Sequence, residues 1–180
     1  MQRIYSFNFA SLYGIYIASF IQTKNKKKKI FFTTFLSRIE KNPPKKLDVL
    51  VEKLEKEVWA EIDCLSCANC CKSMSPTFTQ KDMIRIAKHL ELTVAEFKTK
   101  WLRKERGTGD WINKKMPCQF LDLKSNKCNI YEVRPRDCLG FPHLPKKKMV
   151  EYLHVHKQNV EFCPATANMV EKMKVLFEAK

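Results

Sequence analysis

The stretch Cys64-Leu-Ser-Cys67-Ala-Asn-Cys70-Cys71 (residues 64–71) holds four of the eight cysteines in this chain of 180 residues. A Cys-x-x-Cys turn lets two sulfurs converge on one metal, and thiolate is the ligand type that zinc and iron–sulfur clusters prefer. The first three cysteines have the spacing that opens a bacterial ferredoxin run, but Met74 stands where the next cysteine would fall. The spacing therefore predicts a metal site that takes a further ligand from elsewhere in the chain.

Four more cysteines can supply that ligand: Cys118, Cys128, Cys138 and Cys163. Eight thiolates are the number that two tetrathiolate sites need, so all eight cysteines are candidate metal ligands. The sequence does not assign them to sites. The side chains of adjacent Cys70 and Cys71 are expected to diverge, so that one of the two serves a second ligand set or packs in the core. His143 is a weaker candidate, because enough cysteines are present without it.

Two other thiol chemistries fit the sequence less well. Disulfides require an oxidising compartment, and the chain has no cleavable signal of the usual form. A thioredoxin-like redox pair at Cys64 and Cys67 would need a strand before it and a helix after it, which the pattern does not provide. We therefore expect a cytoplasmic protein whose cysteines bind zinc or an iron–sulfur cluster.

The charge of the chain is a poor guide to its partners. The formal net charge is +15, and six Lys and Arg fall in residues 1–29, where there is no acid. Metal-bound thiolates would cancel part of the remaining charge. The basic residues also form no stripe interleaved with exposed aromatic residues, so we expect nucleic acid not to be a partner. A zinc-stabilised nucleic-acid-binding module is kept as the alternative function.

The N-terminal segment differs in composition from the rest of the chain. Residues 4–21 carry no charge and are followed by the run Lys26–Lys29. This stretch is just long enough for a marginal membrane-spanning helix, and the lysines would hold the remainder on the cytoplasmic side. The alternative is a disordered extension. Because Pro43-Pro44 interrupts the chain and no amphipathic face is evident before it, we predict an extension over 1–44 and one cysteine-cluster domain over 45–180.

Local signals in the second segment predict a mainly α-helical, compact and irregular cysteine-rich domain with one small β-hairpin. Apolar residues at helical spacing and helix caps are the signals for the helices, and a polar turn between two short apolar runs is the signal for the hairpin. The expected elements are helices over about 46–62, after Thr79, after Thr93 and from Pro164, and a hairpin within 117–131.

These motifs, in this order, resemble the YkgJ-like cysteine-cluster family, whose domain is described as zinc- or iron-chelating. The resemblance covers about residues 60–165, and Ala68 stands where the family usually has Gly. The matching motifs are Cys64-x-x-Cys67-x-x-Cys70-Cys71, Pro117-Cys118-x-Phe120-Leu121, Cys128-x-Ile130-Tyr131-x-x-Arg134-Pro135-x-x-Cys138 and Cys163-Pro164.

The resemblance implies a metal ion or cluster as cofactor. Family members are often called iron–sulfur oxidoreductases, and a related cysteine domain occurs in flagellin lysine methylases. The similarity therefore implies a protein that is redox-active or accessory to a modifying enzyme, with a protein partner in the second case. Arg134 and Arg136, close to Cys138, can offset the negative charge of a thiolate-bound metal.

The sequence identifies no catalytic apparatus. The chain has only four glycines and no phosphate-cradling or dinucleotide loop. It also lacks the Cys-x3-Cys-x2-Cys run that is typical of a radical-SAM cluster. The metal is instead expected to be a folding element, because structural metal binding contributes on the order of 10 kcal/mol to stability.

Overall fold

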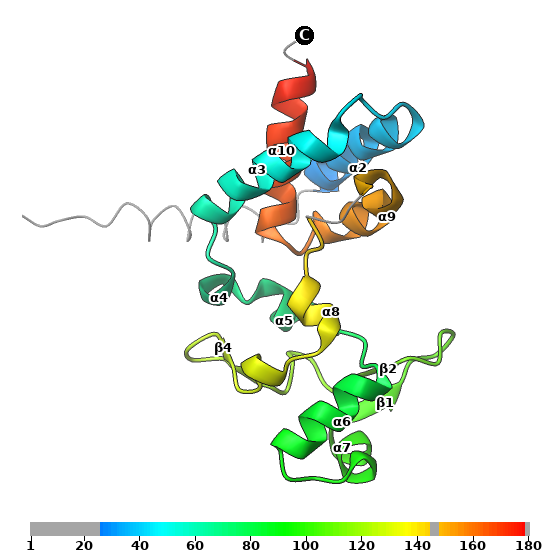
Figure 1. The fold of residues 1–180 in the computed structure, drawn as a ribbon, viewed down its shortest axis with the longest axis vertical. Coiled ribbons are helices and arrows are strands. Elements are labelled where there is room, and N and C mark those ends of the chain that lie inside the picture. The colour runs from blue at the N-terminus through cyan, green and yellow to red at the C-terminus, as the bar shows by residue number, and fades with distance from the viewer. Residues whose placement is uncertain (1–25, 145–147, 179–180) are drawn as a thin grey trace, which may run out of the picture. The chain divides into compact units, whose positions relative to one another are not determined.

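The computed structural model describes residues 26–144 and 148–178, which fall into two compact units (Figure 1). The helical unit comprises the chain up to Asp63 together with the chain from Pro145 onward, and the cysteine unit comprises Cys64–Leu144. The predicted anchor or extension over residues 4–21 lies outside the described residues. Within the described ranges, no helix has the length and apolar character needed to cross a membrane.

The helical unit is built from amphipathic helices that pack on one another. Helix α10 contacts α2 and α3, and α9 also contacts both of them. Leu47, Val51, Leu54 and Val58 are buried along one face of α3, which confirms the predicted helical spacing. The described helices of this unit are α2 (Lys26–Lys41), α3 (Leu47–Glu61), α9 (Met149–Asn159) and α10 (Pro164–Glu178).

Helix α2 was missed, because the sequence analysis found no amphipathic face before Pro43-Pro44. Phe32, Phe35, Leu36 and Ile39 are buried and recur at the spacing of one helix face. Exposed apolar neighbours such as Phe31 and the preceding lysines hide this pattern in the sequence. The extension over residues 1–44 stays a prediction, and the buried face of α2 changes what a truncation experiment should show.

The cysteine unit combines short helices with two small antiparallel sheets. Strand β1 pairs with β2, and β3 pairs with β4. Its elements, in chain order, are α4 (Cys64–Cys67), α5 (Asn69–Ser73), α6 (Gln80–His89), α7 (Val94–Trp101), β1 (Leu102–Lys104), β2 (Trp111–Asn113), β3 (Leu121–Asp122), β4 (Lys127–Cys128), the 3-10 helix η1 (Tyr131–Val133) and α8 (Arg136–Gly140).

A hydrophobic core lies beneath α6 and α7, and it includes Phe78, Met83, Ile86, Phe97 and Phe120. Both helices begin at the predicted caps, and each cap is a reciprocal capping box between the threonine and the acid three residues later. The expected hairpin is β3–β4. The fold is therefore mainly α with small β-hairpins, as predicted, although β1–β2 was not anticipated because its strands are only three residues long.

Candidate metal centre

Four cysteines from separate segments lie within electrostatic reach of one another: Cys71, Cys118, Cys128 and Cys138. The backbone supports this grouping. The amide of Cys118 donates to the carbonyl of Cys71 at 2.8 Å, which joins helix α5 to the loop before β3. Cys128 lies opposite Leu121 in the β3–β4 pair, and the amide of Leu121 donates to the carbonyl of Cys118 at 3.0 Å. These backbone contacts bring together cysteines that are far apart in the sequence.

The thiols in this group are unequal in acidity. Burial raises the pKa of Cys118, Cys128 and Cys138, and the charges of neighbouring cysteines raise it further. Cys71 behaves differently, since a hydrogen bond with Cys70 lowers its pKa to about 7 despite its burial. A bound cation would favour ionisation of all four thiols, because opposite charge stabilises the thiolates that otherwise repel one another. This is the behaviour expected of metal ligands.

The Cys70–Cys71 pair corrects one expectation. The side chains were expected to diverge, yet their sulfurs lie 3.9 Å apart. Both residues belong to helix α5, where consecutive side chains are only about 100° apart, unlike the opposed side chains of a strand. The two thiols therefore lie close together instead of pointing apart.

The other cysteines of the motif lie on α4, which Cys64 begins and Cys67 ends, and on α5, which contains Cys70. Cys64 is exposed, and Cys67 and Cys70 are partly buried. Between α4 and α5, Ala68 has a φ of 47°, in the left-handed region where glycine is least strained. The family resemblance described above implies Gly at this position, where it would carry less strain than Ala68. Asn126 donates to the carbonyl of Ser66 at 3.2 Å, which ties the β3–β4 turn to α4.

The last predicted ligand lies in the helical unit. Cys163 is buried directly before α10, and its amide donates to the carbonyl of Asn159 at 2.8 Å. His143 has its Nε2 at 3.6 Å from the carboxylate of Asp137. Among the described residues, no three His, Cys, Asp or Glu side chains are placed to hold an ion as they stand. The ligand set therefore stays a prediction, and the observation in its favour is the grouping of four thiols.

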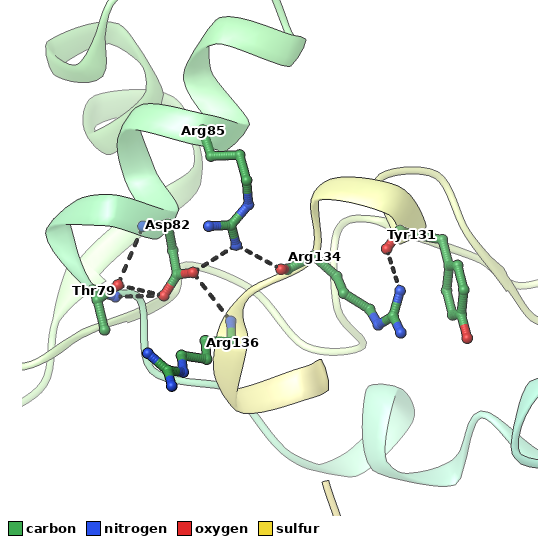
Figure 2. Close-up of polar contacts among 6 residues, drawn as sticks. All are labelled: Thr79, Asp82, Arg85, Tyr131, Arg134 and Arg136. Carbon is green, nitrogen blue, oxygen red and sulfur yellow. Dashed lines mark hydrogen bonds and ion pairs between the residues drawn. The ribbon is translucent and has the colours of Figure 1, made fainter. Parts of the chain in front are cut away.

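Asp82 is the positioning residue that the sequence analysis missed (Figure 2). Its side chain is only 1% exposed. The carboxylate accepts hydrogen bonds from Thr79, from the guanidinium of Arg85 at 2.6 Å and from the backbone amide of Arg136 at 3.1 Å. Arg136 begins α8, two residues before Cys138. A residue expected only to cap α6 therefore also anchors the helix that carries a candidate ligand.

Two further contacts hold α8 in place. Arg85 also donates to the carbonyl of Arg134 at 2.8 Å, just before α8 (Figure 2). The carboxylate of Asp137 accepts a hydrogen bond from the amide of Thr77 at 3.0 Å.

The guanidinium of Arg134 stacks over the ring of Tyr131, 3.7 Å from the ring centre, and its charge opposes the increase in the pKa of Cys128 that burial causes. The predicted role of Arg134 beside a thiolate-bound metal stays a prediction.

A buried amide supports Cys118 in a similar way. Asn113 accepts from Nε2 of Gln119 at 2.9 Å, and its backbone amide donates to Oγ of Ser75 at 2.8 Å. Because the side-chain oxygen is occupied, the amide nitrogen is left for another partner. Burial raises the pKa of Cys118, and the buried Nδ2 of Asn113, which has no hydrogen-bond partner among the described residues, lies near enough to oppose that increase. Such a donor stabilises the thiolate form that a metal requires.

Replacing Asp82 should destabilise the cysteine unit. Burial opposes the ionisation of Asp82, but its hydrogen bonds outweigh burial and hold its pKa below the usual range. Asp82→Ala leaves several donors without their partner, which should cost about 3 kcal/mol in urea unfolding and reduce bound metal. Glu96→Ala is the matched control, since Glu96 forms the same capping box on α7 but is exposed. Equal losses in the two variants would show that Asp82 does no more than cap its helix.

The grouped cysteines of this chain lie on short helices and a hairpin of the cysteine unit. Residues 63–164 match the family model CxxCxxCC, described as "Putative zinc- or iron-chelating domain". The match covers more than half of the chain, so the chain belongs to the CxxCxxCC family, as the sequence motifs predicted.

One relative is the uncharacterized protein MJ0661 of Methanocaldococcus jannaschii. It is 37% identical over 81 residues, which is 44% of this chain. The match spans 43% of that relative's length. No solved structure matches this chain.

Proposed function

We propose that Cys71, Cys118, Cys128 and Cys138 form one tetrathiolate site for zinc or an iron–sulfur cluster. The proposal rests on the backbone contacts that join the segments of Cys71, Cys118 and Cys128, and on the electrostatic influence of these three thiols on Cys138. The four cysteines come from α5, the loop before β3, strand β4 and helix α8. Four thiolates are a complete ligand set for either group. Binding requires the side chains to turn toward a shared centre and to lose their protons.

The surrounding residues are suited to an anionic centre. Four thiolates around a divalent cation carry a net charge of about −2. Arg134 lies close enough to Cys128 to lower its pKa, and the unpartnered Nδ2 of Asn113 lies close enough to Cys118 to lower the pKa of that thiol. Asp82 holds α8 through the backbone amide of Arg136 and not through a cysteine thiol. When bound, zinc would act as a structural link, and an iron–sulfur cluster would carry an electron.

The remaining cysteines stay candidate ligands in this proposal. Cys64 and Cys67 of α4 and Cys70 of α5 are candidates for a second ligand set. Cys163 is a candidate ligand from the segment before α10. We further propose a cytoplasmic protein, redox-active or accessory to a modifying enzyme. Free rather than disulfide-bonded cysteines and the motifs shared with the family support this role.

Serine substitution tests the four ligands. The full chain is purified without oxygen, and its metal content and absorption spectrum are measured. Replacing Cys71, Cys118, Cys128 or Cys138 by serine should in each case abolish most of the metal at that site, because an incomplete ligand set binds weakly. Ser66→Ala, in helix α4, is the matched control and should retain full metal. Unchanged metal content in all four serine variants would refute the site.

The same spectrum separates the two cofactors. Broad visible absorption with stoichiometric iron identifies an iron–sulfur cluster and supports a redox role. A colourless protein with stoichiometric zinc identifies a structural site and rules out the redox role.

A further inference from the structure

The strongest feature outside the cysteine group is a basic segment in the cysteine unit. We name residues 98–115 the basic hairpin, which comprises the end of α7, the β1–β2 pair and the two lysines that follow (Figure 1). It holds seven basic residues and only two acids, Glu105 and Asp110. The basic residues are Lys98, Lys100, Arg103, Lys104, Arg106, Lys114 and Lys115.

The charge of the basic hairpin is not neutralised by neighbours. None of its seven basic side chains forms an ion pair with any residue that the structure describes. The helical unit is different, because Arg38, Lys157 and Lys172 all lie against glutamates there. The positive potential of the hairpin is therefore available to an external anion.

Tryptophan rings and backbone carbonyls hold the lysines of the hairpin. The ammonium groups of Lys98 and Lys104 lie 5.1 Å and 4.8 Å from the centre of the Trp111 ring. Lys100 lies 5.0 Å from the centre of the Trp101 ring. Lys104 also donates to the carbonyl of Gly109 at 2.5 Å, and Lys114 donates to that of Thr99 at 2.8 Å.

This arrangement prepares the lysines for anion binding. An ammonium group has three N–H donors, so each lysine that bonds to one carbonyl keeps donors for a further acceptor. Lysines that are already held in place lose less side-chain entropy on binding. The β1–β2 register sets Lys104 directly opposite Trp111, so the backbone itself fixes this cation beside the ring.

Interleaving of basic and aromatic residues was not expected from the sequence, because a linear pattern does not place side chains beside one another. In the structure, Trp111 lies beside lysines of both α7 and β1. We propose that the basic hairpin binds the phosphate backbone of nucleic acid without sequence selectivity. Ammonium groups that are already positioned along a hairpin can bind the regularly spaced phosphates of a nucleic-acid strand.

A lipid surface fits the basic hairpin less well. Membrane-surface elements insert large apolar side chains beside their basic residues. Residues 98–115 include no large hydrophobic side chain that is exposed, since Leu102 and Ile112 are buried and Trp101 and Trp111 are only partly accessible. Gly107 and Gly109, which have positive φ values, form the turn. The accessible surface is therefore polar and cationic.

The test is fluorescence anisotropy with the full chain and labelled single-stranded RNA and duplex DNA of mixed sequence. Contacts to about four phosphates predict that affinity falls about 100-fold between about 50 mM and 200 mM salt. The double variant Lys98→Gln with Lys104→Gln should bind at least about 10-fold more weakly and give a shallower salt dependence. Unrelated sequences should bind equally well.

The matched control is Lys81→Gln with Lys88→Gln on α6, which removes the same charge from the same unit outside the hairpin. It should lose much less affinity than the hairpin variant. Equal losses in the two double variants would overturn the proposal, because general charge would then explain the binding. So would the absence of binding at low salt, or hairpin-dependent binding to anionic vesicles instead of nucleic acid. Because metal content is measured separately, the result is independent of the proposed thiolate site.

Discussion

Stripping the metal from the full chain should disorder helices α4, α5 and α8 while α6 and α7 remain folded. None of the residues in these three short helices is buried, and each helix has only four or five residues. Helices this short are marginal in water without tertiary support, and the polar contacts of α8 with Asp82 and Thr77 bury none of its residues. If the proposed site forms, metal binding provides that support, on the order of 10 kcal/mol.

Hydrogen exchange measured by mass spectrometry resolves the effect by segment. Chelation should remove amide protection from residues 64–73 and 136–140 and leave it largely intact in α6 and α7, which cover Phe78, Met83 and Phe97. Cys138→Ser should resemble the chelated protein even when metal is supplied. Helix α3 in the helical unit is an internal reference, because its support is a row of buried apolar residues. Unchanged protection in the three short helices after metal loss would contradict the proposed folding role.

Local signals explain which helices could be predicted from the sequence. Thr79 and Thr93 each precede an acid at the third helical position, and this contact depends on neighbouring residues alone. The strands β1 and β2 depend instead on pairing between residues about ten apart, in segments too short for a periodic pattern. Single-sequence patterns therefore identified the capped helices and missed this hairpin.

The candidate site shows the same division between local and distant information. The motif spacing predicted the cysteines as ligands, but it could not show that Cys71 lies with Cys118, Cys128 and Cys138. That grouping depends on the left-handed turn at Ala68 and on long-range backbone contacts. The role of Asp82 was also hidden, because its cap is local while its bond to Arg136 joins residues 54 positions apart.

Helix α2 gives the prediction that most directly tests the domain boundary. Deleting residues 1–41 should unfold the helical unit, because it removes four buried side chains that pack toward α9 and α10. Loss of each large buried apolar side chain costs about 2–5 kcal/mol. The sum is comparable to the entire stability of a typical domain, about 5–15 kcal/mol. The deletion also removes the ion pairs that Arg38 and Glu40 form with Glu178 and Lys157.

Point variants test the contribution of the buried face of α2 to stability without shortening the helix. Leu36→Ala should lower stability by about 3 kcal/mol, since Leu36 is fully buried at 0% exposure. Ile30→Ala is the matched control on the same helix, because Ile30 is 56% exposed and should change stability little. Thermal and urea unfolding measure both variants, and deletion of residues 1–25 isolates the chain before α2. If the chain lacking residues 1–41 melts like the full chain, residues 1–44 are the separable extension that the sequence predicted, and the contacts of α2 contribute little to stability.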